Sequence, residues 1–267
     1  MSRSSEGNSH AMHELTDRRF WKDVWKHEVD LSRYDDDSWV TGNYTYRRFH
    51  DICRAYLRYD ETKTFLDIGC GVGDWSVYFH RTYGYRVTAV DLSAEAVAQA
   101  KRNFERQGID AAVLCEDIFE HKGQYDVIYA GGVIEHFSDP EPILGKMHSL
   151  LKAGGVLINW IPNLEGRTGM LYRLFDRSVF DTHAVLKDEL LVELHRKLGF
   201  EAVDIHYDGS ICLNMLPKAK VGTIGRIVVR VLAKIVSRLC LYLRFVFGHI
   251  EGRWISPFKV VVARRRA

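Results

Sequence analysis

A glycine-spaced turn at the end of a short apolar strand carries the clearest chemical signal in the chain. It reads Asp67-Ile68-Gly69-Cys70-Gly71-Val72-Gly73. Glycines at alternate positions let the backbone turn tightly and approach a ligand more closely than any Cβ would allow. A helix is expected to start at Asp74, so the turn lies at a strand-to-helix junction, where nucleotide-like ligands bind in open α/β sheets. The turn therefore predicts a nucleotide-like ligand.

Two further acidic residues end later strands. Asp91 follows a β-branched strand about 20 residues beyond the glycine turn, where an acid can accept hydrogen bonds from both ribose hydroxyls. The alternative is that Asp91 caps the helix expected over 93–107, a role that Ser93 fills at least as well. Asp117 and Ile118 suit an adenine, with the carboxylate accepting from the exocyclic amine and the side chain of Ile118 covering the ring. The alternative for Asp117 is a solvated loop acid.

Two more patterns follow in order. Gly131-Gly132-Val133-Ile134-Glu135-His136-Phe137 comes after the strand expected over 125–130, and Leu151-Lys152-Ala153-Gly154-Gly155 ends a helix before a buried strand. Together the five patterns resemble the class I S-adenosylmethionine-dependent methyltransferases, in the branch that acts on small molecules and lipid quinones. The resemblance is close over residues 64–161 and looser at the Gly199-Phe200 junction.

This resemblance implies a fold, a cofactor and its binding residues. The fold is a doubly wound α/β sheet of seven strands, mostly parallel, with the strand at 257–263 antiparallel beside 201–207. The cofactor is S-adenosyl-L-methionine. Its methionine part is expected near Asp67, Gly69, Gly71 and Gly73, its ribose at Asp91, and its adenine at Asp117 and Ile118; Cys70, Leu92 and Gly131 complete the cofactor set.

Other classes of protein fit the glycine turn less well. A nicotinamide dehydrogenase has the spacing GxGxxG to meet a pyrophosphate, whereas this chain has GxGxG preceded by an acid that would repel one. A phosphate loop needs a lysine, and none follows Gly73. A non-catalytic module that keeps the fold and binds the cofactor is a further alternative, although the intact set of cofactor residues argues against it.

Methyl transfer to a hydroxyl needs alignment of donor and acceptor and a group that removes the proton. His136 is the best candidate base, because it follows the fourth strand and histidine titrates near neutral pH; a packing role is the alternative. In the segment 162–186, Asp181 and His183 are expected to pair a carboxylate with an imidazole, and a solvated loop is the alternative. Further candidates there are Asn163, Arg167, Tyr172 and Asp176, whereas His206 is expected to be structural.

The alternation of strands and helices predicts one domain with additions. Residues 1–13 are expected to be a disordered N-terminus or a tag, and 14–267 a single methyltransferase domain. An N-terminal helical cap with several aromatic residues (14–60) precedes the cofactor-binding core (61–161). An acceptor-side insertion (162–186) and a core helix and strand (187–208) follow. A basic amphipathic helical insertion (209–255) then leads to the last strand with a basic tail (256–267).

The C-terminal part is strongly basic. From Pro217 onward there are twelve Lys and Arg residues against one acid, Glu251. Over 222–247 the sequence predicts a helix with a basic stripe formed by Arg226, Arg230, Lys234, Arg238 and Arg244. Such a helix suits an anionic membrane surface or a partner, and a cap that packs on the domain is the alternative.

The remaining composition narrows the function. Five scattered cysteines without a CxxC pair argue against a zinc site or a disulfide framework, and indicate a cytoplasmic protein, with or without peripheral membrane contact. No metal is predicted, and nucleic acid is disfavoured as a partner. We expect methyl transfer to a hydroxyl of a small or lipid-linked acceptor, such as a natural product, a sugar or a quinone-like molecule; N- or C-methylation is the alternative.

Overall fold

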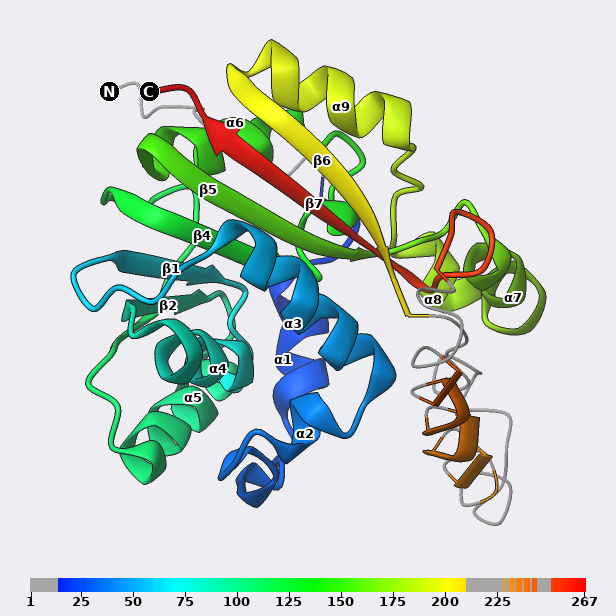
Figure 1. Ribbon diagram of the computed structural model, residues 1–267, viewed down its shortest axis with the longest axis horizontal. Helices are drawn as coiled ribbons and strands as arrows, with labels where there is room; N and C mark the ends of the chain where they lie inside the picture. Colours follow the sequence, from blue (N-terminus) through cyan, green and yellow to red (C-terminus); the bar gives the residue numbers. More distant parts are fainter. Residues whose placement is uncertain are drawn as a thin grey trace, which may run out of the picture.

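The computed structural model describes residues 14–209 and 251–267, together with scattered positions between 228 and 243. A seven-stranded sheet forms the centre, with the strand order β3-β2-β1-β4-β5-β7-β6 (Figure 1). Its strands are β1 (Thr64–Ile68), β2 (Arg86–Asp91), β3 (Ala112–Cys115), β4 (Tyr125–Gly131), β5 (Leu151–Pro162), β6 (Phe200–Asp208) and β7 (Phe258–Arg265). β1 to β5 run parallel, and β7 is antiparallel to both of its neighbours, so the predicted sheet is confirmed.

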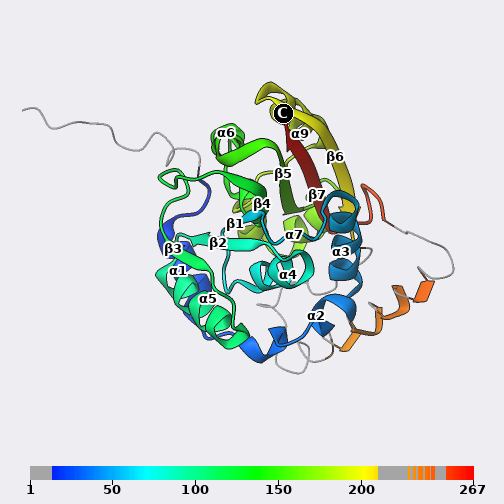
Figure 2. The same cartoon turned by 60° about the vertical axis from the view of Figure 1, so that its left-hand side comes forward.

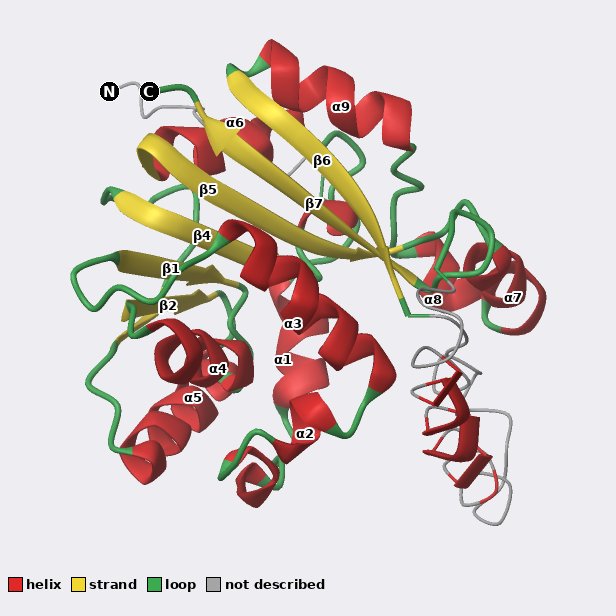
Figure 3. Ribbon diagram, viewed as in Figure 1, coloured by secondary structure: helices red, strands yellow, loops and turns green. Residues whose placement is uncertain are grey.

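Helices cover both faces of this sheet (Figures 2 and 3). One face packs against α3, α4 and α5, and the other against α6 and α9. The helices of the described residues are α1 (Arg18–Trp25), α2 (Ser38–Thr41), α3 (Tyr44–Tyr56), α4 (Asp74–Tyr83), α5 (Ala94–Gln107), α6 (Glu141–Leu150), α7 (Arg167–Phe175), α8 (Arg177–Asp181) and α9 (Asp188–Lys197), with 3₁₀ turns η2 (Leu31–Tyr34) and η3 (Ile134–His136).

Local sequence signals set the bounds of the helices that border the site. Gly73 precedes α4 with φ +74°, a conformation that costs a glycine little. Ser93 caps α5, because its hydroxyl accepts a hydrogen bond from the Ala96 N–H at 3.3 Å. Asp17 caps α1 in the same way, accepting from the Phe20 N–H at 2.8 Å. The caps thus hold α1, α4 and α5 at fixed places around the carboxyl edge of the sheet.

Helix α1 differs from the usual surface helix. None of its residues is buried, and Phe20 and Val24 are exposed although they lie on its apolar face. The physical reason is its position: α1 packs beside α5 at the open edge of the sheet, and Trp21 and Trp25 border a cavity there instead of joining the main core.

Two regions depart from the sequence expectation or lie beyond it. The segment 162–186 contains the helices α7 and α8, which the sequence analysis did not predict. The basic helix expected over 222–247 lies outside the described residues, apart from scattered positions. No helix among the described residues is both long enough and apolar enough to cross a lipid bilayer.

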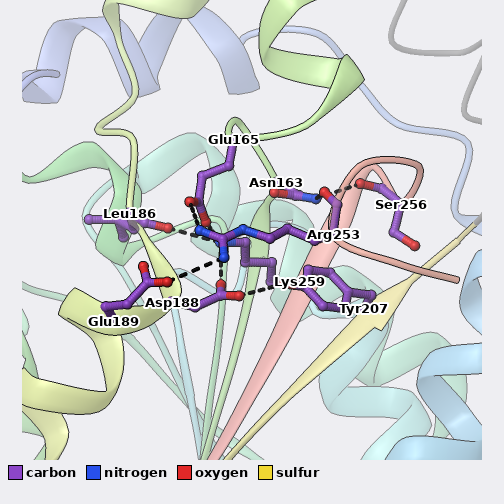
Figure 4. Close-up of polar contacts among 9 residues, drawn as sticks. All are labelled: Asn163, Glu165, Leu186, Asp188, Glu189, Tyr207, Arg253, Ser256 and Lys259. Atoms are coloured by element: carbon purple, nitrogen blue, oxygen red, sulfur yellow. Dashed lines mark hydrogen bonds and ion pairs between the residues drawn. The ribbon is translucent and has the colours of Figure 1, made fainter.

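A buried lysine fastens the two ends of the segment that carries α7 and α8 (Figure 4). Lys259 on β7 has a fully buried side chain. Its ammonium donates to Glu165, which precedes α7, and to Asp188, which begins α9. It also donates to the Leu186 carbonyl at 3.1 Å. A charge so deeply buried is tolerated only because every donor has an acceptor.

A second layer of contacts holds the same region. The Arg253 guanidinium donates to Glu165 at 2.7 Å and to Glu189 at 3.2 Å (Figure 4). The Asn163 side-chain amide donates to the backbone carbonyls of Arg253 at 2.7 Å and of Ser256 at 2.9 Å. These contacts join the end of β5, the start of α9 and the turn before β7.

We predict that Lys259→Met destabilises the protein by about 3–5 kcal/mol, because it leaves two carboxylates near each other without their buried cation. Lys152→Met is the matched control: Lys152 forms a partly exposed pair with Asp126, and its loss should cost less than about 1 kcal/mol. Chemical denaturation measures both values. Equal losses for the two variants would contradict a stabilising role for the buried ammonium.

Candidate functional site

A cavity of about 540 Å³ opens at the carboxyl edge of the sheet. This volume falls within the range of about 300–1,000 Å³ that small-molecule sites occupy. The cavity lies where β1 and β4 are neighbours and the strand order reverses, which is where ligands bind in open α/β sheets. It is bordered by the turn after β1, the ends of β2 and β4, helix α1 and the segment 162–186.

The glycine turn shapes one wall of the cavity. Gly69 and Gly71 line it, with φ of +69° and +55°. A Cβ at Gly71 would come within 2.7 Å of the indole ring of Trp25, so the absence of a side chain lets α1 close over the turn. Gly73, which the sequence assigned to the same wall, packs against Phe104 and is not among the lining residues.

Asp91 ties the glycine turn to the start of α5. One carboxylate oxygen accepts from the Gly71 N–H at 2.9 Å, and the other accepts from the Ser93 N–H at 2.8 Å. The capping role falls to Ser93, which leaves the remaining lone pairs of Asp91 facing the cavity that it lines. Burial raises the pKa of this carboxyl above its ordinary value.

Two further acids lie at the centre of the cavity wall. Asp67 is buried, and the Ser76 hydroxyl donates to it at 2.6 Å. Burial raises the pKa of Asp67 to about 7, and burial raises the pKa of Asp74 to about 6. Desolvation favours the protonated form of such groups, and a cationic ligand would favour the ionised form. The wall therefore suits a ligand that carries positive charge.

The other expected cofactor residues are also brought to the cavity. Asp117 and Ile118 line it beyond β3, and the Asp117 carboxylate accepts from the Phe119 N–H at 3.0 Å. Cys70, Leu92 and Gly131 are lining residues as well. Thus the sequence located nine of its ten cofactor positions at one cavity, with Gly73 outside it.

Two imidazoles meet at the end of the cavity beyond β4. The rings of His136 and His183 lie 4.6 Å apart between centroids, and Trp21 contacts His136 edge-on at 4.8 Å. The Nδ1 of His136 lies 2.9 Å from the Thr182 carbonyl, and the Nδ1 of His183 lies 2.7 Å from the Val179 carbonyl. Both Nδ1 atoms must therefore carry the proton, which leaves each Nε2 as an acceptor.

Burial determines the charge of these imidazoles. It lowers the pKa of His136 to about 4, with a further contribution from the nearby His183. Burial also lowers the pKa of His183. Near neutral pH both rings are uncharged, so their Nε2 lone pairs are free to accept a hydrogen bond or to bind a Lewis acid.

Asp181 corrects the pairing expected from the sequence. Its carboxylate forms an exposed ion pair with Arg177 one turn earlier on α8, and it does not line the cavity. The i,i+4 spacing on this short helix directs the carboxylate to solvent, while the chain turns and carries His183 inward. The imidazole partner of His183 is His136 instead of a carboxylate.

The remaining sequence candidates divide between the cavity and the scaffold. Tyr172 on α7 lines the cavity. Asn163 is buried in the contacts near Lys259, Asp176 caps α8, and His206 hydrogen-bonds to the Tyr56 hydroxyl, so these three act in the scaffold. Arg167 begins α7 and is not a lining residue.

Several lining residues were not singled out by the sequence. Asp74 and Trp75 directly follow the glycine turn, and Glu135 lies in the motif after β4. Their closeness to these motifs was the sequence signal that could have identified them. Trp160 and Phe258 come from β5 and β7 and meet at 4.9 Å between ring centroids. Their pairing depends on the antiparallel register of β5 and β7, which no local pattern encodes.

Comparisons with known proteins agree with this geometry. Residues 65–155 match a family described as a methyltransferase domain. A ubiquinone biosynthesis O-methyltransferase of Caulobacter vibrioides is 38% identical over 101 residues, which cover 36% of this chain and 40% of that protein. The same enzyme of Thiobacillus denitrificans is 24% identical over 62% of this chain and 79% of its own length. The chain thus spans about two fifths of the first of these relatives.

A solved structure extends the likeness over most of the fold. Phosphoethanolamine N-methyltransferase 2 of Haemonchus contortus, in complex with S-adenosyl-L-methionine, aligns with a TM-score of 0.61 at 16% identity. The alignment covers 94% of this chain and 60% of that one. The matched domain, the strand order and the acidic cavity agree: residues 65–155 match a methyltransferase domain, and the fold is that of solved S-adenosylmethionine-dependent methyltransferases, which bind S-adenosyl-L-methionine.

Proposed function

We propose that the protein transfers the methyl group of S-adenosyl-L-methionine to a hydroxyl of an uncharged, ring-bearing or lipid-linked acceptor of the quinone-like type. The pair of uncharged imidazoles at one end of the cavity carries this proposal. The cofactor lies along the turn after β1 and the ends of β2 and β3, and the acceptor enters between α1 and the segment 162–186.

The charge of the cavity supports an acceptor without phosphate. Seven of its described lining residues are acidic and none of them is Lys or Arg: Glu14, Asp67, Asp74, Asp91, Glu116, Asp117 and Glu135. A phosphorylated acceptor would meet repulsion here and find no cation among the described residues. The sulfonium and ammonium groups of the cofactor meet charge of the opposite sign.

Aromatic side chains support a flat, apolar acceptor. Trp21 and Trp25 contribute from α1, Tyr46 from α3, and Trp160 and Phe258 from the sheet. Rings of this kind bind a planar acceptor by stacking and edge contacts. The relatives named as ubiquinone biosynthesis O-methyltransferases point to the same class of acceptor.

His136 acts on the acceptor hydroxyl. Its Nδ1–H is fixed on the Thr182 carbonyl, so Nε2 takes the hydroxyl proton while the oxygen attacks the methyl carbon. The new O–C bond forms as the S–C bond breaks, and S-adenosylhomocysteine leaves. His183 holds the His136 ring from the side of the insertion.

An amine acceptor is the second candidate. The acidic cavity would attract a protonated amine, and a neutral imidazole could take its proton before transfer. A paired assay with a catechol and with an aromatic amine of similar size separates the two. If only the amine is methylated, N-methylation replaces O-methylation as the proposed reaction.

The protein presents an exposed apolar face that suits a lipid-linked acceptor. Met170, Leu171, Leu174 and Phe175 are exposed within one arc of α7, opposite Tyr172, which faces the cavity. Trp254 is 70% exposed, and its carbonyl accepts from the Arg167 N–H at the start of α7. We propose that this apolar surface touches an anionic membrane next to the cavity mouth. The basic stripe predicted over 222–247 would add attraction to anionic lipid.

Asp67→Asn should weaken the binding of S-adenosylhomocysteine by at least about tenfold, because it removes a charge-assisted contact to the amino group. Wild-type affinity should rise as the pH increases through about 7, since the ligand's ammonium favours ionised Asp67. The variant should lose most of this pH dependence. Calorimetric titration at several pH values measures both, with the exposed Asp110→Asn as control; equal pH profiles would contradict the assignment.

The same substitution should stabilise the protein without ligand. A carboxyl whose folded pKa lies above its unfolded value destabilises the fold as the pH rises from about 4 to about 7, by about 4 kcal/mol at most. Asp67→Asn should therefore raise the melting temperature by several degrees at about pH 8 and little at about pH 4. Scanning calorimetry tests this, and a lower melting temperature at high pH would show that Asp67 supports the fold.

His136→Ala should lower the turnover of a catechol-type acceptor by about 100-fold or more while the affinity for S-adenosylhomocysteine stays within about twofold. His206→Ala, at a histidine outside the cavity, should leave turnover near the wild-type rate. If turnover of the His136 variant falls by less than about threefold, His136 does not act as the base.

Replacing Met170, Leu174 and Trp254 together by Ser should abolish flotation of the protein with anionic liposomes. Tyr59→Ser is the control, because Tyr59 is 63% exposed and lies before β1 at the opposite edge of the sheet. Wild-type protein that fails to float, or a triple variant that floats equally well, would rule out this membrane surface.

A further inference from the structure

Three side chains at the reactive end of the cavity are arranged like a set of metal ligands. Glu135, His136 and His183 each offer a ligand atom, and these atoms all lie within 4.8 Å of one another. Glu135 is 2% exposed, and its Oε2 has no hydrogen-bond partner among the described residues. A buried carboxylate oxygen without a partner is costly, so this oxygen points to a cation that the site is built to receive.

The histidine contacts strengthen this reading. Each Nδ1–H donates to a backbone carbonyl, of Thr182 for His136 and of Val179 for His183. Histidines that bind metals characteristically donate one ring N–H to a carbonyl or carboxylate, which fixes the tautomer and directs the other nitrogen to the metal. Both rings therefore present an unprotonated Nε2 from fixed positions.

We propose that Glu135, His136 and His183 bind one divalent transition-metal cation at the acceptor end of the cavity. This inference rests on the proposed function, since it assigns the cation to the same acceptor hydroxyl. Two imidazoles and one carboxylate favour Zn²⁺, Fe²⁺ or Co²⁺ over Mg²⁺, which prefers oxygen ligands and water. Three protein ligands leave open positions for the acceptor oxygen, as in catalytic sites. The sequence predicted no metal, because His183 lies far along the chain from Glu135 and His136.

The cation refines the chemistry of the hydroxyl. An acceptor oxygen bound to a divalent cation ionises at lower pH, and its proton passes to solvent. With the cation bound, the ionised acceptor oxygen would attack the methyl carbon; the O–C bond would form as the S–C bond breaks, and S-adenosylhomocysteine would leave. His136 is then a ligand in the loaded enzyme and a base only without the cation.

Cobalt absorption spectroscopy tests the binding directly. Purified full-length protein is freed of metal with a chelator and titrated with Co²⁺. We expect visible d–d bands that saturate at one equivalent and disappear when Zn²⁺ is added. Glu135→Gln and His183→Ala should each weaken Co²⁺ binding by at least about tenfold. His50→Ala is the control, because His50 lies outside the cavity and contacts the Tyr78 hydroxyl.

The affinity for S-adenosylhomocysteine, measured on every variant, shows whether the fold is intact. Saturable bands that depend on Glu135 and His183 but not on His50 support the site. The absence of bands, or equal affinity in all variants that still bind S-adenosylhomocysteine, overturns it. Turnover separates the two proposals. If the protein binds the metal but methylates no acceptor, the proposed function is wrong and the cation site stands. If turnover requires His136 and persists after treatment with a chelator, the cation site is wrong and the proposed function stands.

Discussion

The wall of the cavity formed by the segment 162–186 depends on the buried ammonium of Lys259. It contacts Glu165 at one end of the segment 166–185 and Leu186 and Asp188 at the other, so both ends of this segment are fixed on β7. Fixing the ends of a loop lowers the entropy that its ordered form must overcome. The middle of the segment can then carry Tyr172 and His183 to the cavity. Lys259 is the one cation that contacts both ends of the segment from within the buried core of the described residues.

Two backbone contacts complete the attachment at the reactive end. The Ala184 N–H donates to the Glu135 carbonyl at 2.6 Å, and the Thr182 carbonyl accepts from His136. The segment therefore sets the tautomer and orientation of the very histidine that follows β4. The opposite side of the cavity works through electrostatics: Asp67, Asp74 and Asp91 keep raised pKa values in a cavity whose described lining contains no Lys or Arg. In their ionised forms these acids would attract a cationic ligand.

The sequence brought most of its candidate cofactor residues to one cavity, because the signals that mark them are local. The turn Gly69–Gly71 and the acids at Asp91 and Asp117 each follow a strand, and parallel strands bring their carboxyl ends to one edge. The wall formed by the segment 162–186 could not be derived in this way. His183 meets His136 only through the fold of α7 and α8, and adjacency in sequence wrongly suggested Asp181 as its partner. The packing of Trp25 over Gly71 likewise depends on where α1 lies, which its apolar pattern did not reveal.

In the proposed arrangement, the cofactor's sulfur faces the histidine pair across the end of β4. A crystal structure with S-adenosylhomocysteine bound tests this most directly. We expect ribose hydroxyls on Asp91, adenine beside Asp117 and Ile118, and the sulfur directed toward the space between His136 and Trp21. A ligand with its sulfur turned away from His136, or one bound outside this cavity, would contradict the proposed arrangement and the chemistry derived from it.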